Sequence, residues 1–350
     1  MVKNQLKETS EAEKKKEEIE TKTNQPPNRG QLKIDATCAP ADISYPTDLG
    51  ILNTAREQTE KIIDILYSSQ KEKLKEKPRT YRQKARKDYL EVAKRKRPSN
   101  KQRRKAIGKQ LQYLKRNLNH LDRMIALGLT LEVLSKQQYK RLLVVTEIYR
   151  QQELMWSNRQ TRIDDRIVSI FQPHIRPIVR GKAGKPVEFG AKLSASCFDG
   201  YVFLDRISWD NFNESVELKK QVEAFKKLTG VEPESVHVDK IYRTRENRAW
   251  CKAKGIRISG IPLGRPPASL SKESKKQFIE DERIRNEIEG KFGVSKRRFS
   301  LNRVMTKLDK TTETSIAITF LVMNLVTLLR QKICRFFVPI YLKKLMISNL

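Results

Sequence analysis

The sequence predicts an α/β protein with a mixed sheet, flanking helices and a large all-α insertion after the first strand. Three observations lead to this class. Short apolar runs typical of strands begin near residue 31, helical repeats separate the later strands, and a long stretch of purely helical periodicity follows the first strand. With that stretch set aside, the order is strand, two-stranded hairpin, helix, strand, helix, strand, helix, which is typical of an α/β layer.

The composition predicts a polyanionic partner. The 350 residues carry a formal net charge of +32, so nucleic acid is the expected partner. The four cysteines form no CxxC pair and only three histidines accompany them, which argues against disulfide bridges and a zinc site. Residues 1–30 are charged and lack the apolar segment of a secretory signal, so we expect a disordered tail and a cytoplasmic, nucleoid-associated protein.

The first apolar run, QLKIDATCAP, predicts a short strand. Leu32 and Ile34 share one face, and the strand is expected to end at Asp35, with Pro40 closing the segment soon after. A carboxylate at the end of an apolar strand is often only a turn or cap residue. Asp35 alone therefore gives weak support for catalysis.

Residues 46–159 predict a helical insertion. Thr47 or Asp48 can cap its first helix, Ser99 a second helix that Gly128 ends, and a third is expected from about Ser135 to Met155. Between residues 71 and 120, 20 Lys or Arg stand against 4 Asp or Glu. A solvated helix face is the alternative, but few acidic residues are present to pair at i,i+4, so contacts with nucleic-acid phosphates are favoured. The densest basic runs are Lys94, Arg95, Lys96 and Arg97, and Arg103, Arg104 and Lys105.

The second half of the chain predicts a hairpin and two further strands. Asp199-Gly200 suits a type I′ turn between two strands within residues 189–209. Asn213 can cap a following helix that Gly230 ends, and the strand SVHV ends in Asp239. Two strand-end aspartates are thereby predicted, and functional groups gather beyond the carboxyl ends of strands in such sheets.

The stretch DERIRNEIEGKFGVSK, residues 281–296, predicts a helix with a charged row beside an apolar stripe. At about 100° per residue, Arg285, Glu289 and Lys296 fall on one side, whereas Glu287 points to another. Gly290 and Gly293 are positions at which this helix could bend or end. With Asp35 and Asp239, Glu289 offers only hard oxygen ligands, which suit Mg²⁺ or Mn²⁺.

In these motifs the chain resembles the DDE transposases of bacterial and archaeal insertion sequences, in the insertion-sequence four/five superfamily. The signature Y-x2-R-x3-E-x6-K is met by Arg285, Glu289 and Lys296, with Glu282 in the place of the tyrosine. The segments around Asp35 and Asp239 resemble the family's first and second aspartate motifs. The resemblance covers residues from Gln31 to about Leu329.

The resemblance implies a ribonuclease-H-like fold and a transposase. Asp35, Asp239 and Glu289 would be the catalytic carboxylates and the ligands of two Mg²⁺ or Mn²⁺ ions, which cleave strands at the element's ends and transfer them to a target. Arg285 and Lys296 would hold phosphate. Double-stranded DNA, as inverted repeats and target, is the implied partner, and joining two ends implies a dimer. The implied organisation is a tail at 1–30, a catalytic domain from 31–45 and 160–330, the insertion at 46–159, and an apolar, basic tail at 331–350.

Two segments depart from the family pattern. Only 34 residues precede Asp35, where the family has a helical DNA-binding region, so an N-terminally shortened copy is expected. The apolar run within residues 312–329 is interrupted by Asn324 and is too short for a bilayer, so a core helix is expected and no membrane partner. The competing hypothesis is a catalytically inactive remnant that acts only as a basic DNA-binding protein.

Overall fold

The computed structural model describes residues 27–74, 76–182, 185–261 and 271–347. The charged tail predicted at 1–30 therefore lies outside the described residues, apart from 27–30, and so does most of the proline-rich turn after residue 260. In chain order the elements are β1 (Gln31–Pro40), α2 (Asp48–Ser69), η1 (Lys71–Lys73), α3 (Arg82–Ala93), α4 (Asn100–Ala126), η2 (Leu131–Val133), α5 (Lys136–Ser157), β2 (Arg176–Lys182), β3 (Lys185–Phe198), β4 (Tyr201–Ser208), η3 (Glu214–Glu217), α6 (Leu218–Thr229), β5 (Ser235–Val238), η4 (Lys240–Tyr242), α7 (Arg245–Ala253), β6 (Arg257–Ile258), α8 (Lys272–Arg298) and α9 (Asp309–Ile347).

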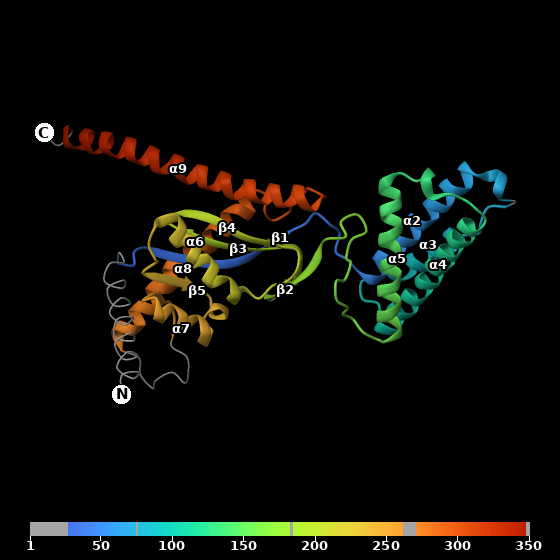
Figure 1. Ribbon diagram of the computed structural model, residues 1–350, viewed down its shortest axis with the longest axis horizontal. Helices are drawn as coiled ribbons and strands as arrows, with labels where there is room; N and C mark the ends of the chain where they lie inside the picture. The colour runs from blue at the N-terminus through green and yellow to red at the C-terminus, as the bar shows by residue number, and fades with distance from the viewer. Residues whose placement is uncertain (1–26, 75, 183–184, 262–270, 348–350) are drawn as a thin grey trace, which may run out of the picture.

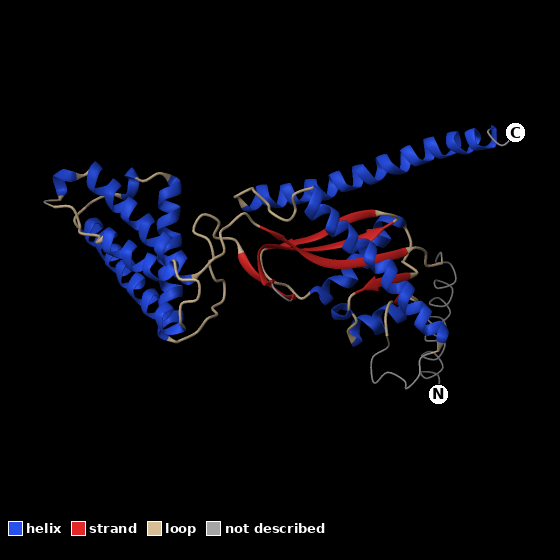
Figure 2. Ribbon diagram, turned by 180° about the vertical axis from the view of Figure 1, so that it is seen from behind, coloured by secondary structure: helices blue, strands red, loops and turns tan. Residues whose placement is uncertain are grey.

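The strands form one mixed, six-stranded sheet, in agreement with a ribonuclease-H-like α/β fold (Figure 2). Its order is β2-β3-β1-β5-β6, and β4 also pairs with β3. β1 runs antiparallel to β3 and parallel to β5, and β5 runs parallel to β6. The predicted fold class is therefore confirmed, including the all-α insertion, which occupies the chain between β1 and β2.

Helices cover both faces of the sheet. On one face, α6 and α7 pack against a core that includes Leu32, Ile34, Val236 and Val238. On the other, α8 and α9 pack against small and apolar residues of β3, with Ile288 and Phe292 of α8 in that core. Because side chains alternate along a strand, Lys33, Asp35 and Thr37 turn toward the α8 face.

β1 is longer than the sequence predicted, and the expectation that it ends at Asp35 is wrong. Its pairing with β3 continues from Lys33↔Cys197 through Asp35↔Ala195 to Pro40↔Gly190. This partner is distant in sequence, so the local pattern did not reveal the extension. At the end of the pairing the backbones approach closely, since a Cβ added at Gly190 would lie 2.1 Å from the carbonyl oxygen of Ala39.

Several local predictions are confirmed. Asp199 and Gly200 both have positive φ, 51° and 80°, as a type I′ turn requires. Thr47 and Ser99 cap α2 and α4, Ser99 through a capping box, and α5 begins at Lys136, close to the expected start near Ser135. Cys38, Cys197 and Cys251 are buried free thiols.

The helical insertion has cores of its own beside the sheet (Figure 1). Two clusters, one around Leu52, Leu114 and Ile148 and the other around Ile63, Leu121 and Met124, join α2, α4 and α5. No sheet residue within the described ranges belongs to either cluster. The insertion thus buries its apolar side chains independently of the sheet.

Helix α9 lies along β4 and then extends beyond the sheet (Figure 1). Its inner face, with Ile316, Phe320 and Met323, belongs to the sheet core. Asn324 fixes it further, because its side-chain amide accepts from the Val202 N–H at 2.9 Å and donates to the Val202 carbonyl at 2.8 Å. The outer face is exposed, and the segment Asp309–Ile333 is long and apolar enough to span a membrane, by length and composition alone. The expected core helix is therefore buried on its inner face only, and the expectation that the apolar run is too short for a bilayer is wrong, because the apolar segment extends over 25 residues.

Candidate active site

The parallel pairing of β1 with β5 brings two aspartates to neighbouring positions. The last register pair is Ile34↔Val238, so the next positions are Asp35, still within β1, and Asp239, the first residue after β5. In-register residues of parallel strands point to the same face. Asp35 accepts a hydrogen bond from the Ala36 N–H at 2.8 Å, and Asp239 one from the Lys240 N–H at 2.6 Å at the start of η4.

Helix α8 adds the third carboxylate. It runs without interruption from Lys272 to Arg298, so neither Gly290 nor Gly293 ends it. Its apolar contacts through Ile288 and Phe292 set its rotation on the sheet. Asp35, Asp239, Glu289 and Arg285 consequently line one pocket of about 760 Å³.

Arg285 links the acidic residues of α8. Its Nη1 lies 2.7 Å from Oε1 of Glu289, and its guanidinium also binds Glu282, the residue in the place of the family tyrosine. The hydrogen bond to Glu282 is the main cause that raises the Arg285 pKa. The Arg285 side chain is only 13% exposed, whereas that of Glu289 is 47% exposed. Arg285 therefore both neutralises Glu289 and restricts its orientation.

Other predicted site residues lie outside the pocket. Lys296 is two helical turns beyond Glu289 on α8 and does not line the pocket in the described part of the chain. Glu287, predicted to point away from the charged row, contacts the sheet through Lys33, at 3.0 Å. The basic runs belong to the insertion: Lys94, Arg95, Lys96 and Arg97 follow α3 and are exposed, and Arg103, Arg104 and Lys105 lie in the first turns of α4.

Glu214 is an acidic pocket residue that the sequence did not reveal. It begins η3 and forms an ion pair of 2.9 Å with Lys192 of β3. Lys192 is held in turn by the Asn211 side chain and the Phe212 carbonyl. The only local signal was the Asn213 cap beside it. The pocket thus holds four carboxylates, one on β1, one directly after β5, one on η3 and one on α8, against Lys192 and Arg285.

The carboxylates of the pocket are of the kind that binds a divalent cation. Three hard carboxylates around one pocket fit Mg²⁺ or Mn²⁺ by ligand chemistry. Within the described ranges, however, no three His, Cys, Asp or Glu side chains are close enough together to hold a metal ion. The ion pair with Arg285 also engages one oxygen of Glu289. To bind a metal ion through this oxygen, Glu289 would have to release Arg285.

Burial raises the pKa of Asp35 to about 6. Loss of solvation is the main cause; the Ala36 N–H lowers the pKa, and the negative charge of Glu214 raises it. Because the folded-state pKa lies above the ordinary value of 3.8, ionising Asp35 costs stability. The cost is absent below about pH 4, grows between pH 4 and 6 and is complete above pH 6.

Asp35→Asn is therefore expected to stabilise the folded protein in a pH-dependent manner. In metal-free buffer at pH 8 the free energy of unfolding should rise by about 2 kcal/mol, and the gain should fall as the pH is lowered to 4. Chemical denaturation at both pH values measures this difference. Asp239→Asn removes an exposed carboxyl and serves as the control, with a smaller effect. An equal change at both pH values would contradict the proposed cost of ionising Asp35.

The fold and the pocket define a class: a ribonuclease-H-like protein with carboxylates from two adjacent strands and one helix around a single pocket. Residues 236–326 match the sequence model of the transposase DDE domain family. The matched segment contains Asp239 and Glu289 and begins after Asp35. It supports a DDE transposase. Neither a curated protein nor a solved structure gives a significant match to the chain.

Proposed function

We propose that this protein is a DNA transposase of the insertion-sequence type that cleaves strands at the ends of an element and transfers them to a target. The observation that carries the proposal is that Asp35 and Asp239 directly follow the last register pair of the adjacent parallel strands β1 and β5 and share one pocket with Glu289. The match of residues 236–326 to the transposase DDE domain supports the same reaction class.

Asp35, Asp239 and Glu289 are the proposed ligands of two Mg²⁺ or Mn²⁺ ions. When bound, such ions neutralise charge on a phosphodiester and activate the attacking oxygen. The chain's own contribution is positional. Asp35 lies within the paired backbone of β1, β5 places Asp239 directly after its last paired residue, and Arg285 pairs with Glu289. Arg285, with Lys296 farther along α8, is proposed to bind DNA phosphate.

Double-stranded DNA, as element ends and target, is the proposed partner. The exposed cations Lys94 to Arg97 and the cluster Arg103 to Lys105 provide a positive surface on the insertion, and each neutralised phosphate would add affinity through counterion release. Joining two element ends requires two active sites, so a dimer is proposed for the reaction. The expected setting is the cytoplasm, on the nucleoid.

Metal-dependent nicking of a supercoiled plasmid tests the proposal. The full-length protein is expected to convert supercoiled plasmid to the nicked circle with Mg²⁺ or Mn²⁺, and not with EDTA, because the pocket carboxylates need a cation to activate the attacking oxygen. Gel electrophoresis over time measures the rate. Plasmid binding without any metal-dependent nicking would contradict the proposal and favour a binding protein without catalysis.

A further inference from the structure

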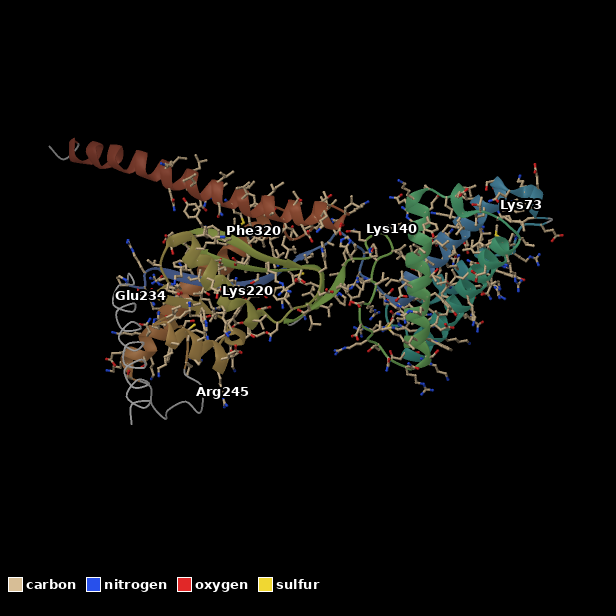
Figure 3. The ribbon with its side chains drawn as sticks, in the orientation of Figure 1. Lys73, Lys140, Lys220, Glu234, Arg245 and Phe320 are labelled. Carbon is tan, nitrogen blue, oxygen red and sulfur yellow. The ribbon has the colours of Figure 1, made fainter. Side chains whose placement is uncertain are left out.

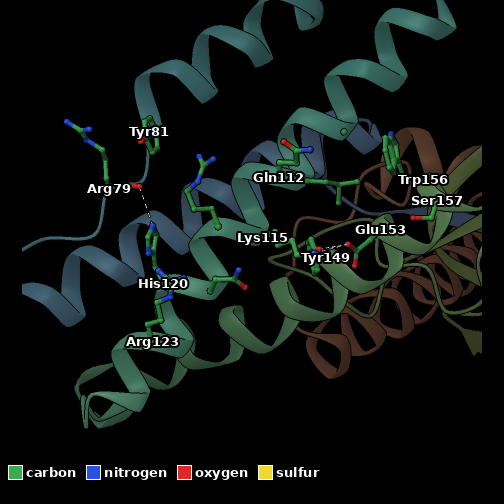
Figure 4. A pocket seen from close by; sticks show the side chains of 14 residues that line it. Arg79, Tyr81, Gln112, Lys115, His120, Arg123, Tyr149, Glu153, Trp156 and Ser157 are labelled. Atoms are coloured by element: carbon green, nitrogen blue, oxygen red, sulfur yellow. Dashed lines mark hydrogen bonds and ion pairs between the residues drawn. The ribbon is translucent and has the colours of Figure 1, made fainter.

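A second pocket lies on the helical insertion, away from the candidate active site. It has a volume of about 690 Å³ and lies between the segment before α3, one face of α4, and α5. Figure 4 shows Arg79 and Tyr81 on one side of His120, and Tyr149 and Glu153 on α5. We call this pocket the insertion groove.

The insertion groove is strongly basic. Arg79, Lys115, Arg116 and Arg123 line it, with Glu153 as its one acidic residue. The Glu153 carboxylate already has two partners, since it accepts a hydrogen bond of 2.5 Å from Tyr149 and lies 3.9 Å from Lys115. Among the described residues, Arg79, Arg116 and Arg123 have no carboxylate within ion-pair distance. Their positive charge is uncompensated.

Aromatic rings lie against three of the guanidinium groups. Arg79 lies 5.8 Å from the ring centre of Tyr81. Arg116 lies 4.7 Å from the ring centre of Tyr81 and 5.6 Å from that of Tyr113. Arg104 lies 4.7 Å from the ring centre of Trp156, at the end of the insertion groove. Such contacts restrict the arginines while leaving their N–H groups able to donate. Because guanidinium groups lie against Tyr81 and Trp156, phosphate binding is favoured over base stacking.

The basic face follows α4 over a length suited to a DNA duplex. Arg104, Gly108, Gln112, Lys115, Asn119 and Arg123 recur at spacings of three or four residues and therefore lie on one side of the helix. From Arg104 to Arg123 the helix rises by about 28 Å at 1.5 Å per residue. One turn of duplex DNA is about 34 Å long. The face can accordingly contact several phosphates of one duplex.

We propose that the insertion groove binds the sugar–phosphate backbone of duplex DNA, at a site separate from the catalytic pocket. The choice of DNA as the polyanion rests on the proposed function. Recognition is independent of sequence, because lysine and arginine contacts to phosphate carry no base information. The groove extends the basic surface of Arg103 to Lys105 along α4 and gives the insertion its role in holding DNA while the sheet carries the carboxylates.

The double variant Arg116→Gln/Arg123→Gln of the full-length protein tests the proposal. Binding to a fluorescent 30-base-pair duplex is measured by anisotropy in EDTA. The salt concentration is varied between about 50 and 200 mM, the range over which phosphate contacts make the affinity strongly salt-dependent. The variant is expected to bind about 10-fold more weakly, and the slope of log affinity against log salt should fall by about 2, one unit per lost phosphate contact. Lys136→Gln/Lys140→Gln removes the same charge from exposed positions of α5 outside the groove and should change affinity by less than about 2-fold.

Three outcomes would overturn the proposal. They are unchanged duplex affinity, an equal loss in the Lys136/Lys140 control, and a greater loss for a single-stranded 30-mer than for the duplex. Arg79→Gln changes one exposed side chain without disturbing α4 and repeats the test in case the double variant unfolds. It removes one positive charge, so the salt slope should fall by about 1 and the affinity by less than in the double variant; an unchanged slope contradicts the proposal. EDTA makes the readout independent of cleavage. If the wild-type protein nicks plasmid and the groove variants bind duplex normally, this inference fails and the proposed function stands. If the groove variants lose binding and the wild-type protein does not nick, the proposed function fails and this inference stands.

Discussion

Asp35→Asn, Asp239→Asn and Glu289→Gln are each expected to reduce metal-dependent nicking by about 10³-fold or more, because each removes a charged ligand from a site that must hold divalent cations. Each substituted amide side chain has nearly the same shape as the carboxylate it replaces. Duplex affinity should remain close to wild type, since the basic surface of the insertion is unchanged. Plasmid nicking and anisotropy with the same preparations give both quantities.

Glu280→Gln is the matched control for these variants. Glu280 lies on α8, pairs only with Arg283 among the described residues and does not line the pocket. Its nicking rate should stay within about 2-fold of wild type, as expected for an exposed i,i+3 pair. Equal residual nicking in wild type, control and all three variants would identify a contaminating nuclease and contradict the assignment.

The second large effect is expected at the contact between Lys33 and Glu287. The Lys33 side chain is 8% exposed and its Nζ lies 3.0 Å from Oε2 of Glu287, whose side chain is 36% exposed. Glu287→Ala leaves a buried ammonium without this partner, and the free energy of unfolding should fall by about 3 kcal/mol. Urea denaturation measures the change.

The double variant Lys33→Met/Glu287→Leu separates charge burial from packing. Replacing both partners by apolar side chains removes the unpaired charge, so most of the stability lost in Glu287→Ala should return. Lys33→Met alone leaves the more accessible carboxylate, which water can solvate, and should cost less than Glu287→Ala. Equal losses in Glu287→Ala and the double variant would mean that packing, and not the buried charge, sets the effect.

The sequence predicted those features that depend on neighbouring residues. The helix caps at Thr47 and Ser99 and the Asp199-Gly200 turn each follow from a few adjacent side chains. The pairing of Arg285 with Glu289 follows equally from the helical repeat.

Features that depend on distant partners were missed. β1 extends past Asp35 because β3, more than 150 residues later, continues to pair with it. β2 was not predicted, since RPIVRGK lacks a clear alternation and forms a strand by pairing with β3. Glu214 joins the pocket only through the turn that brings η3 against Lys192. The insertion groove likewise requires α4 and α5 to pack side by side, which no local pattern shows.

The contact of Asn324 with Val202 has a consequence for self-association. β4 has β3 as its one strand neighbour in the described part of the sheet, so its other side presents backbone groups that a strand from another molecule could pair with. The Asn324 amide satisfies both the N–H and the carbonyl of Val202, as an added strand would. The polar residue that interrupts the apolar helix therefore occupies the backbone groups of Val202 that edge-to-edge pairing would need.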